Sequence, residues 1–336
     1  MTAIEPSASQ SSESLASDAQ LARERVVSVV QSYGAAIVLA LLVVIASISF
    51  PTFLTPNNLT NIATQSSFPL IVAIGMTFVI LTGGIDLSVG SVFALGGVLG
   101  AMGSQSGVGG TFLLPIVAGV VIGAIQGGLV AYAGMAPFIV TLAGLLAVRG
   151  LVLAVTNAGS NTPLITDPVT SVIGQGKVLG VSYTVLIALV LLAAGVVLLA
   201  RSRGGQSILA IGGSESAATL MGLPVARVKF VVYVVSGVCA ALAGSLNAAY
   251  SSSGVPTVGV GLELSAISAV VIGGTLLSGG KGSLIGTLAG VLLLAVIQNM
   301  INQVGSLTSS VQAVVSGGFL AVVVIIQTVL ARSQRL

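Results

Sequence analysis

Long apolar runs recur along the chain, and they limit its possible folds more than any other feature of the sequence. A helix needs about 20 predominantly apolar residues to cross a bilayer. Segments of this length, or slightly shorter, lie at approximately 33–51, 66–82, 88–104, 111–133, 138–157, 181–200, 230–250, 263–279, 283–303 and 310–330. The sequence therefore predicts an all-α polytopic membrane protein with about ten transmembrane helices.

The low content of charged residues supports this prediction. Only 6% of the 336 residues are charged, whereas soluble domains carry roughly 25%, so most of the surface must face membrane lipid. The formal net charge of +3 is too small and too dispersed to indicate a nucleic-acid partner. The chain has no histidine and one cysteine, Cys239, so we expect no catalytic residues, no metal site, no cofactor and no internal disulfide.

The basic residues predict how the chain is oriented. Cytoplasmic segments of membrane proteins carry an excess of Lys and Arg. If the N-terminus is inside, Lys177 is the only basic residue outside and Arg149 falls within a span. The inner segments then hold Arg23, Arg25, Arg201, Arg203, Arg227, Lys229, Lys281, Arg332 and Arg335. We therefore expect both termini in the cytoplasm.

The chain divides into two parts. Residues 1–25 begin with a polar, Ser-rich stretch and are expected to form a disordered cytoplasmic tail. Residues 26–336 are expected to form the transmembrane domain, with a cytoplasmic loop at 204–229. The outer loops, at about 158–180 and 251–262, do not resemble a folded domain. Capture of a solute outside the cell would therefore need a separate protein.

The long cytoplasmic loop contains the signals of a short capped helix. Ser214 can accept a hydrogen bond from a free amide at the start, and Glu215 places a negative charge in the first turn. Ala217 and Ala218 favour helix, and Gly222 can end it in a left-handed conformation. A capped helix of this kind between membrane spans, with basic residues beside it, is expected to be held by a cytoplasmic partner.

Three charged residues lie in or beside apolar segments, and each has two interpretations. Asp86, within GGIDLSVG, could bind a cation, a sugar hydroxyl or an arginine, or it could simply cap the next helix. Arg149 lies near the middle of its span, where it could form a structural ion pair or line a path. Glu263 could pair with Arg149 or act as an ordinary first-turn acid.

A group of amides lies in the ninth apolar segment. Gln298, Asn299, Asn302 and Gln303 form two pairs with i, i+4 spacing, which places them on adjoining helix faces. Amides both donate and accept hydrogen bonds, so they suit a path for a polyhydroxylated solute. Hydrogen bonding between helices is the alternative.

The stretch GGTLLSGGKGS at 273–283 superficially resembles a phosphate-binding loop. The match fails because Thr275 stands where the first glycine is required, and Gly282 follows the lysine where Ser or Thr is required. We expect no ATPase site in this chain.

Three stretches carry a resemblance to a known family. They are GMTFVILTGGIDLSVGSVFALGGVLGA at 75–101, the loop and helix at 212–244, and ELSAISAVVIGGTLLSGGKGSLIGTLAGVLLLAVIQNMIN at 263–302. They resemble the membrane permease subunit of bacterial monosaccharide importers, which are ATP-binding-cassette transporters of the ribose, xylose, galactose and autoinducer-2 group. The loop resembles the element of such importers in which an acid is followed by two alanines and a glycine.

This resemblance implies a multi-pass subunit of the bacterial cytoplasmic (inner) membrane that provides the path for a ribose-like monosaccharide. It implies a second permease subunit, often an identical copy, and an extracytoplasmic sugar-binding protein that delivers the substrate. Two cytoplasmic ATPase subunits would dock on the helix around 214–222 and hydrolyse ATP. The coupling residues would be Ser214, Glu215, Ala217, Ala218 and Gly222.

Two alternatives stay open. The first is a permease for another small solute, such as a nucleoside or a branched-chain amino acid. The second is an ion-coupled secondary transporter, in which Asp86 and Arg149 would form the coupling pair. A secondary transporter needs no docking site for an ATPase, so the helix in the 204–229 loop discriminates between the classes.

Overall fold

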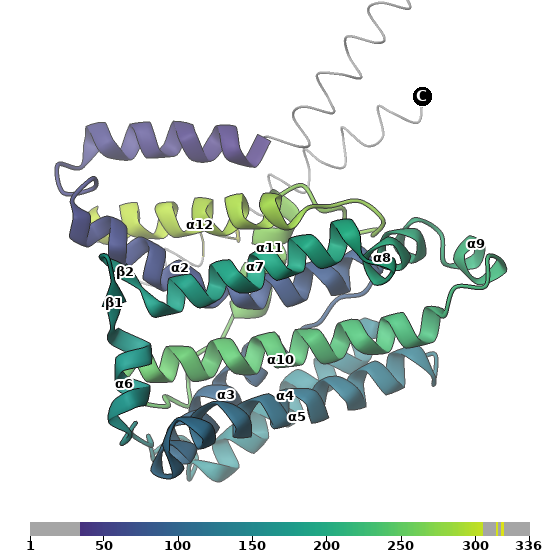
Figure 1. Ribbon diagram of the computed structural model, residues 1–336, viewed down its shortest axis with the longest axis horizontal. Coiled ribbons are helices and arrows are strands. Elements are labelled where there is room, and N and C mark those ends of the chain that lie inside the picture. The colour runs from purple at the N-terminus through teal and green to yellow at the C-terminus, as the bar shows by residue number, and fades with distance from the viewer. Residues whose placement is uncertain (1–33, 305–313, 315–316, 319–336) are drawn as a thin grey trace, which may run out of the picture.

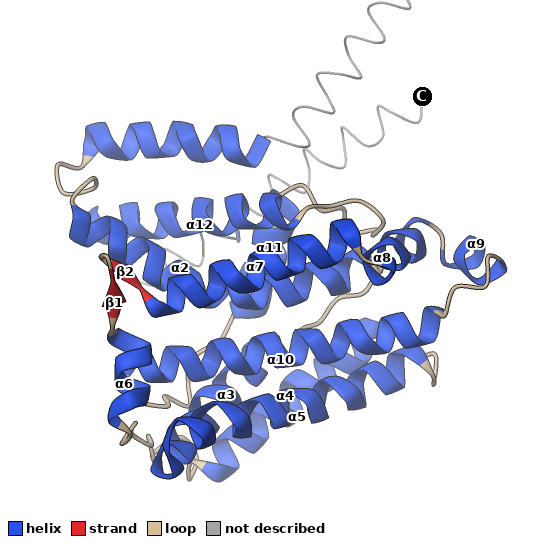
Figure 2. Ribbon diagram, in the orientation of Figure 1, coloured by secondary structure: helices blue, strands red, loops and turns tan. Residues whose placement is uncertain are grey.

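The structure is a bundle of helices of unequal length (Figures 1 and 2). It is a computed structural model, and it describes residues 34–304, 314, 317 and 318. The predicted tail at 1–25 lies outside the described residues, as does nearly all of the predicted span at 310–330. Within the described part, the only paired strands are β1 (Lys177–Val178) and β2 (Val181–Ser182), which form a short antiparallel hairpin. The fold is therefore all-α, as predicted.

The helices follow one another along the chain with connections of unequal length. A first apolar helix spans Gly34–Ser49. The others are α2 (Pro56–Leu81), α3 (Val89–Gly103), the short 3-10 helix η1 (Ser104–Ser106), α4 (Gly107–Ala131), α5 (Pro137–Val155), α6 (Pro168–Gln175), α7 (Tyr183–Arg201), α8 (Arg203–Gly213), α9 (Glu215–Leu220), α10 (Val225–Ser251), α11 (Leu262–Ile272) and α12 (Leu284–Val304).

Six helical segments of the described chain are long and apolar enough to cross a membrane, fewer than the ten predicted. They are Pro56–Leu81, Val89–Ala131, Pro137–Val155, Tyr183–Arg201, Val225–Ser251 and Leu284–Val304. The predicted segments at 88–104 and 111–133 are the separate helices α3 and α4, which pack against each other across a turn at Gly107 with φ of 77° and are counted above as one stretch. Leu262–Ile272 is too short to cross as a straight helix. Gly34–Ser49 is described only from residue 34 onward, and the predicted span at 310–330 lies almost entirely outside the described residues.

Helix α2 lies at the centre of the bundle. Its most apolar stretch is 89% buried, more than that of any other candidate span in the described chain. It contacts α7, α10, α11 and α12, while α10 in turn contacts α3 and α4. The protein is thus layered in Figure 1, with α12 and the helix Gly34–Ser49 on one side of α2 and with α10, α3, α4 and α5 on the other.

Glycines bring α3 and α10 into backbone contact. A Cβ atom added to Gly96 would overlap the backbone of Ala241, and one added to Gly244 would overlap the carbonyl oxygen of Phe93. Small residues at helix contacts in membranes permit this approach, and van der Waals contact then holds the helices together. The high glycine content of the sequence therefore has a direct use in packing.

Two connections run inside the bundle without helical structure. Residues 82–88 join α2 to α3, and residues 252–261 join α10 to α11. The second connection runs back along α3, since Gly254 packs against Gly97 and Gly259 packs against Gly90. As a result α11 begins within the bundle and has 11 residues, whereas the sequence predicted a span at 263–279.

The loop predicted at about 158–180 is more ordered than expected. It contains α6, whose first turn is capped by the Asp167 carboxylate accepting from the Thr170 amide at 2.7 Å. It is also attached to the end of α10, because the Ile165 amide donates to the Ser252 carbonyl and the Gly254 amide donates to the Pro163 carbonyl. It thus closes over one end of α10.

Candidate functional site

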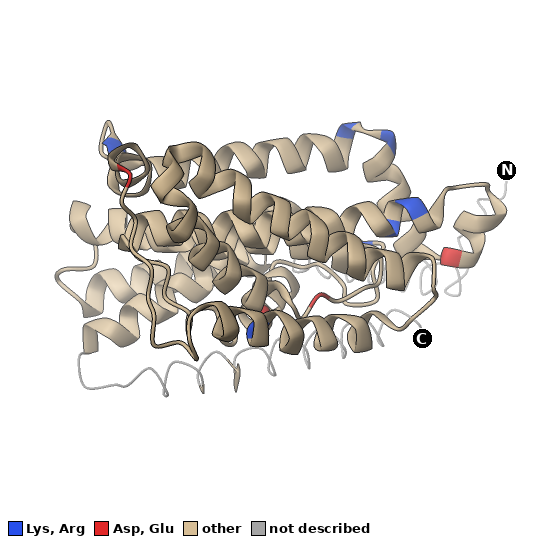
Figure 3. Cartoon of the chain, turned by 90° about the horizontal axis from the view of Figure 1, so that it is seen from below, with Lys and Arg blue, Asp and Glu red and all other residues tan. Residues whose placement is uncertain are grey.

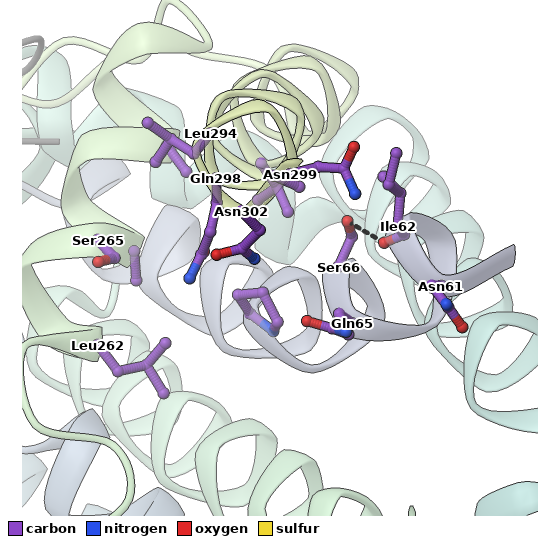
Figure 4. A pocket seen from close by; sticks show the side chains of 15 residues that line it. Asn61, Ile62, Gln65, Ser66, Leu262, Ser265, Leu294, Gln298, Asn299 and Asn302 are labelled. Atoms are coloured by element: carbon purple, nitrogen blue, oxygen red, sulfur yellow. Dashed lines mark hydrogen bonds between the residues drawn. The ribbon is translucent and has the colours of Figure 1, made fainter. Parts of the chain in front are cut away.

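A polar pocket lies between α2, α11 and α12 (Figure 4). Its volume is about 210 Å³. The polar lining consists of amides and hydroxyls, and none of the lining residues is charged. The polar lining residues are Asn61, Gln65, Ser66, Ser265, Gln298, Asn299 and Asn302. We call this cavity the amide pocket.

Helical spacing explains how the amide pocket forms. Asn61 and Gln65 are four residues apart on α2, and so are Gln298 and Asn302 on α12, so each pair lies on one helix face. Figure 4 shows Gln298 and Asn302 projecting from α12 toward the α2 segment that carries Gln65. The two faces enclose a cavity that can both donate and accept hydrogen bonds.

Asn299, one of the predicted amides, also forms hydrogen bonds with two residues outside the amide pocket. Its side chain exchanges hydrogen bonds with Asn58, at 2.8 and 3.2 Å, and accepts one from Gln303 at 2.7 Å. Thr52 donates to the Gln303 side chain at 2.7 Å. Gln303 does not line the amide pocket, and it instead ties the end of α12 to the segment before α2.

A second cavity, of about 430 Å³, adjoins the amide pocket and is lined by residues of α2, α3, α10 and the segment that begins α11. Its distinctive lining residues are the aromatic side chains of Phe68, Phe93 and Tyr250, so we call it the aromatic pocket. The Phe68 and Tyr250 ring centroids are 5.7 Å apart. The two cavities share Gln65, Pro69, Leu262 and Ser265 as lining residues. Gln65 and Ser265 therefore provide polar groups to both.

Asp86 is buried in the connection between α2 and α3. Its carboxylate accepts hydrogen bonds from the Ser88 amide at 3.0 Å, the Ser88 hydroxyl at 2.7 Å and the Ser236 hydroxyl of α10 at 2.7 Å. The Ser88 hydroxyl also lies 3.1 Å from the amide oxygen of Gln126. Asp86 is 1% exposed and does not line the amide pocket. These bonds fix the connection against α10.

Arg149 binds backbone rather than a carboxylate. Its guanidinium donates to the carbonyl oxygens of Pro256 and Val258, both at 3.0 Å. The ion pair that the sequence suggested with Asp86 or Glu263 is not formed. Glu263 accepts from the amide of Gly261 at 3.2 Å, at the start of α11. Arg149 and Glu263 thus both stabilise the non-helical connection before α11 and the start of that helix.

The short helix predicted in the 204–229 loop is α9. Ser214 precedes it and accepts from the Ala217 amide at 3.3 Å, while Gly222 follows it with φ of 76°. Glu215 forms an ion pair with Lys229 of α10 at 2.7 Å. Ala218 is buried, whereas Leu220 and Met221 are 90% and 67% exposed. The helix therefore presents an apolar tip outward.

Basic residues gather at the end of the bundle that carries α8 and α9 (Figure 3). This group comprises Arg201, Arg203, Arg227, Lys229 and Lys281, which follows the residue that packs against α8. Lys177 lies in β1, at the opposite end. The ends of the bundle therefore differ in charge in the sense expected from the sequence.

Sequence reasoning missed Asn61, Gln65, Ser66 and Ser265 as lining residues. The sequence predicted a span beginning at 66, but α2 begins at Pro56. The polar residues in the first turns of α2 lower the mean hydropathy of that segment, and such a pattern is typical of a loop. The i, i+4 spacing of Asn61 and Gln65 was the available signal.

A bundle of membrane-length helices around uncharged polar cavities defines a multi-pass membrane protein suited to moving a small polar solute. The chain belongs to the family described as the permease component of branched-chain amino acid transport systems, whose model matches residues 58–326. It is a transport subunit of the cytoplasmic membrane.

Individual relatives are similar over most of their length. The chain is 42% identical to the ribose import permease protein of Bacillus subtilis (strain 168), over 91% of this chain and 94% of the relative. It is 43% identical to the ribose import permease protein of Escherichia coli (strain K12), over 80% and 85%. It is 36% identical to the D-allose transport system permease protein of Escherichia coli (strain K12), over 89% and 92%. No solved structure matches the chain.

Proposed function

We propose that this chain is the permease subunit of an ATP-driven importer and that it carries a ribose-like monosaccharide. The observation that supports this most directly is the amide pocket, whose polar lining has hydrogen-bonding groups but no charge. Relatives named as ribose and allose permeases support the same substrate class. A neutral polyol presents several hydroxyls, each of which donates and accepts, as amides do.

The lining also argues against an amino acid as substrate, although the family description names one. A free amino acid carries an ammonium and a carboxylate, and their transfer into a cavity without charged partners is costly. The residues that line the amide and aromatic pockets include no charged side chain. A monosaccharide does not carry this cost.

The predicted site residues then divide by role. Gln298, Asn299 and Asn302 line the path, and Gln303 holds Asn299 in place. Asp86, Arg149 and Glu263 hold the two non-helical connections in position rather than bind the sugar, in line with the bonds that each forms.

The assembly follows from the same proposal. The chain crosses the membrane about ten times with both termini in the cytoplasm, and the α8–α9 end faces inward. A second permease subunit, which we propose is an identical copy, completes the membrane-embedded part of the importer. Two cytoplasmic ATPase subunits dock on α9 through Ser214, Glu215, Ala217, Ala218 and Gly222. An extracytoplasmic sugar-binding protein delivers the substrate.

Co-purification from detergent tests this function. The tagged chain is expected to bring along an ATPase subunit, and a ribose-loaded binding protein is expected to stimulate ATP hydrolysis by the complex. The contrary outcome is a chain that purifies without any ATPase and transports under an ion gradient when reconstituted alone. That result would establish a secondary transporter instead.

A further inference from the structure

Three segments that are distant in sequence meet through their backbones beside α9. The amide of Gly280, between α11 and α12, donates to the carbonyl oxygen of Leu81 at 3.0 Å. Gly212 of α8 lies against both, since an added Cβ atom would overlap the Leu81 carbonyl oxygen and the Gly280 nitrogen. We call the contact of Leu81, Gly212 and Gly280 the glycine junction. It leaves no room for a side chain at Gly212.

The glycine junction connects α9 to the walls of the amide pocket. Leu81 is the last residue of α2, and Gly280 belongs to the connection that joins α11 to α12. The residues that line the amide pocket come from α2, α11 and α12 alone. Gly212 is two residues before Ser214, which caps α9. A displacement of α9 therefore reaches all three pocket helices through one point.

The junction is not packed on every side. A cavity of about 390 Å³ borders it, and Gly83, Gly212, Ser278 and Ser214 are among the lining residues. Close-packed interiors resist continuous deformation, whereas an adjacent cavity gives the three segments space to shift together. The structure thus combines a rigid contact with free volume beside it.

We propose that Gly212 is a positioning residue of transport. In this proposal the backbone contact at Gly212 transmits movement of α9 to the ends of α2, α11 and α12, and so changes the shape of the amide pocket. The proposal rests on the proposed function, because it requires an ATPase that moves α9. Gly212 itself touches no substrate.

The chain offers a matched pair of substitutions for the test. Gly212→Ala places a methyl group into the Leu81 and Gly280 backbones, whereas Gly213→Ala, one residue later, places it where no atom lies within 4 Å. Each variant is reconstituted with its ATPase and binding protein, and sugar uptake per ATP hydrolysed is measured. We expect this ratio to fall at least about tenfold for Gly212→Ala and to stay within about twofold for Gly213→Ala, with the ATPase still bound in both.

A second measurement covers the case in which Gly212→Ala does not fold. Hydrogen exchange of the wild-type complex is compared with and without ATP. We expect altered exchange at 276–282 and at 82–88 as well as at 214–222. Changes confined to 214–222, or normal coupling of Gly212→Ala, would overturn the inference and leave the proposed function standing. If no ATPase associates with the wild-type chain, both fail together.

Discussion

The amide pocket and the glycine junction lie toward opposite ends of the same three helices, and they are built from different parts of the chain. The pocket uses side chains of α2, such as Asn61 and Gln65, and of α12, such as Gln298 and Asn302. The junction uses backbone atoms of Leu81, Gly212 and Gly280.

The comparison shows that recognition of a solute and transmission of movement require opposite features of a helix. Recognition of a solute requires polar side chains that project into space, so their removal changes the chemistry of a cavity. Transmission by contact requires that side chains be absent, because backbones can then touch. Substitutions at the junction should therefore act mainly on folding and coupling, and substitutions in the pocket mainly on substrate affinity.

The largest loss of stability is expected from Gly280→Val at the glycine junction. Gly280 has φ of 77°, and an added Cβ atom would lie 2.7 Å from the Gly213 nitrogen. Strained backbone costs about 1–3 kcal/mol, and overpacking adds about 1–3 kcal/mol. Unfolding can be followed with a thiol-reactive dye, because the single cysteine, Cys239, is buried.

Gly134→Val is the control for this substitution. Gly134 has φ of 67° but no atom within 4 Å of an added Cβ, so the variant should show the strain without the overlap. Equal destabilisation of the two variants would mean that close backbone contact at the junction contributes nothing to stability.

A smaller loss of stability is expected from Arg149→Leu. The substitution removes the donors that bind the Pro256 and Val258 carbonyls, and hydrogen bonds to charged groups contribute about 1.5–3 kcal/mol. The connection that they hold leads to Val260 and Leu262 in the pocket walls, so uptake should also fall. The exposed Lys177→Leu variant is the control, and equal tolerance of both would remove the structural role of Arg149.

In the pocket, Gln65→Leu is expected to change affinity with little effect on folding. Gln65 lines both cavities. Loss of one hydrogen bond to the sugar costs about 0.5–1.5 kcal/mol, so KM for uptake should rise about two- to tenfold while the free energy of unfolding changes by less than about 0.5 kcal/mol. Gln105→Leu, on the exposed η1 turn, should leave KM unchanged. A normal KM for Gln65→Leu would exclude Gln65 from the path.

The smallest effect on stability is expected at α9. Glu215→Arg breaks the ion pair with Lys229, but the Glu215 side chain is 57% exposed, and exposed pairs contribute less than about 1 kcal/mol. If α9 docks on an ATPase, hydrolysis should nevertheless become uncoupled from uptake. Lys229→Gln removes the same ion pair and should stay coupled. Normal coupling in Glu215→Arg would argue against docking through this residue.

The helical content and most helix positions were predictable because lipid demands long apolar runs. Both ends of α9 were predictable as well, since Ser214 before the helix and Gly222 after it carry local signals that do not depend on the rest of the fold. These features are encoded by neighbouring residues.

The polar contacts were less accessible from the sequence. The partners of Arg149 are carbonyl oxygens, and every residue has a carbonyl, so no residue type could indicate them. The start of α2 was misplaced because its first turns are rich in polar residues, such as Asn57, Asn58 and Asn61, and therefore lack a continuous apolar run. The glycine junction joins residues about 70 to 200 positions apart, and only the folded chain brings them together.

The apolar tip of α9 has a consequence for how such a protein must be made. Leu220 and Met221 are largely exposed in the isolated chain. Exposed apolar surface favours aggregation unless a partner covers it. A cell that synthesises this subunit in excess of its proposed ATPase would accumulate chains in which the apolar tip of α9 stays uncovered. If α9 docks on an ATPase, balanced synthesis of the two proteins, or rapid degradation of the surplus, would be needed to keep this surface covered.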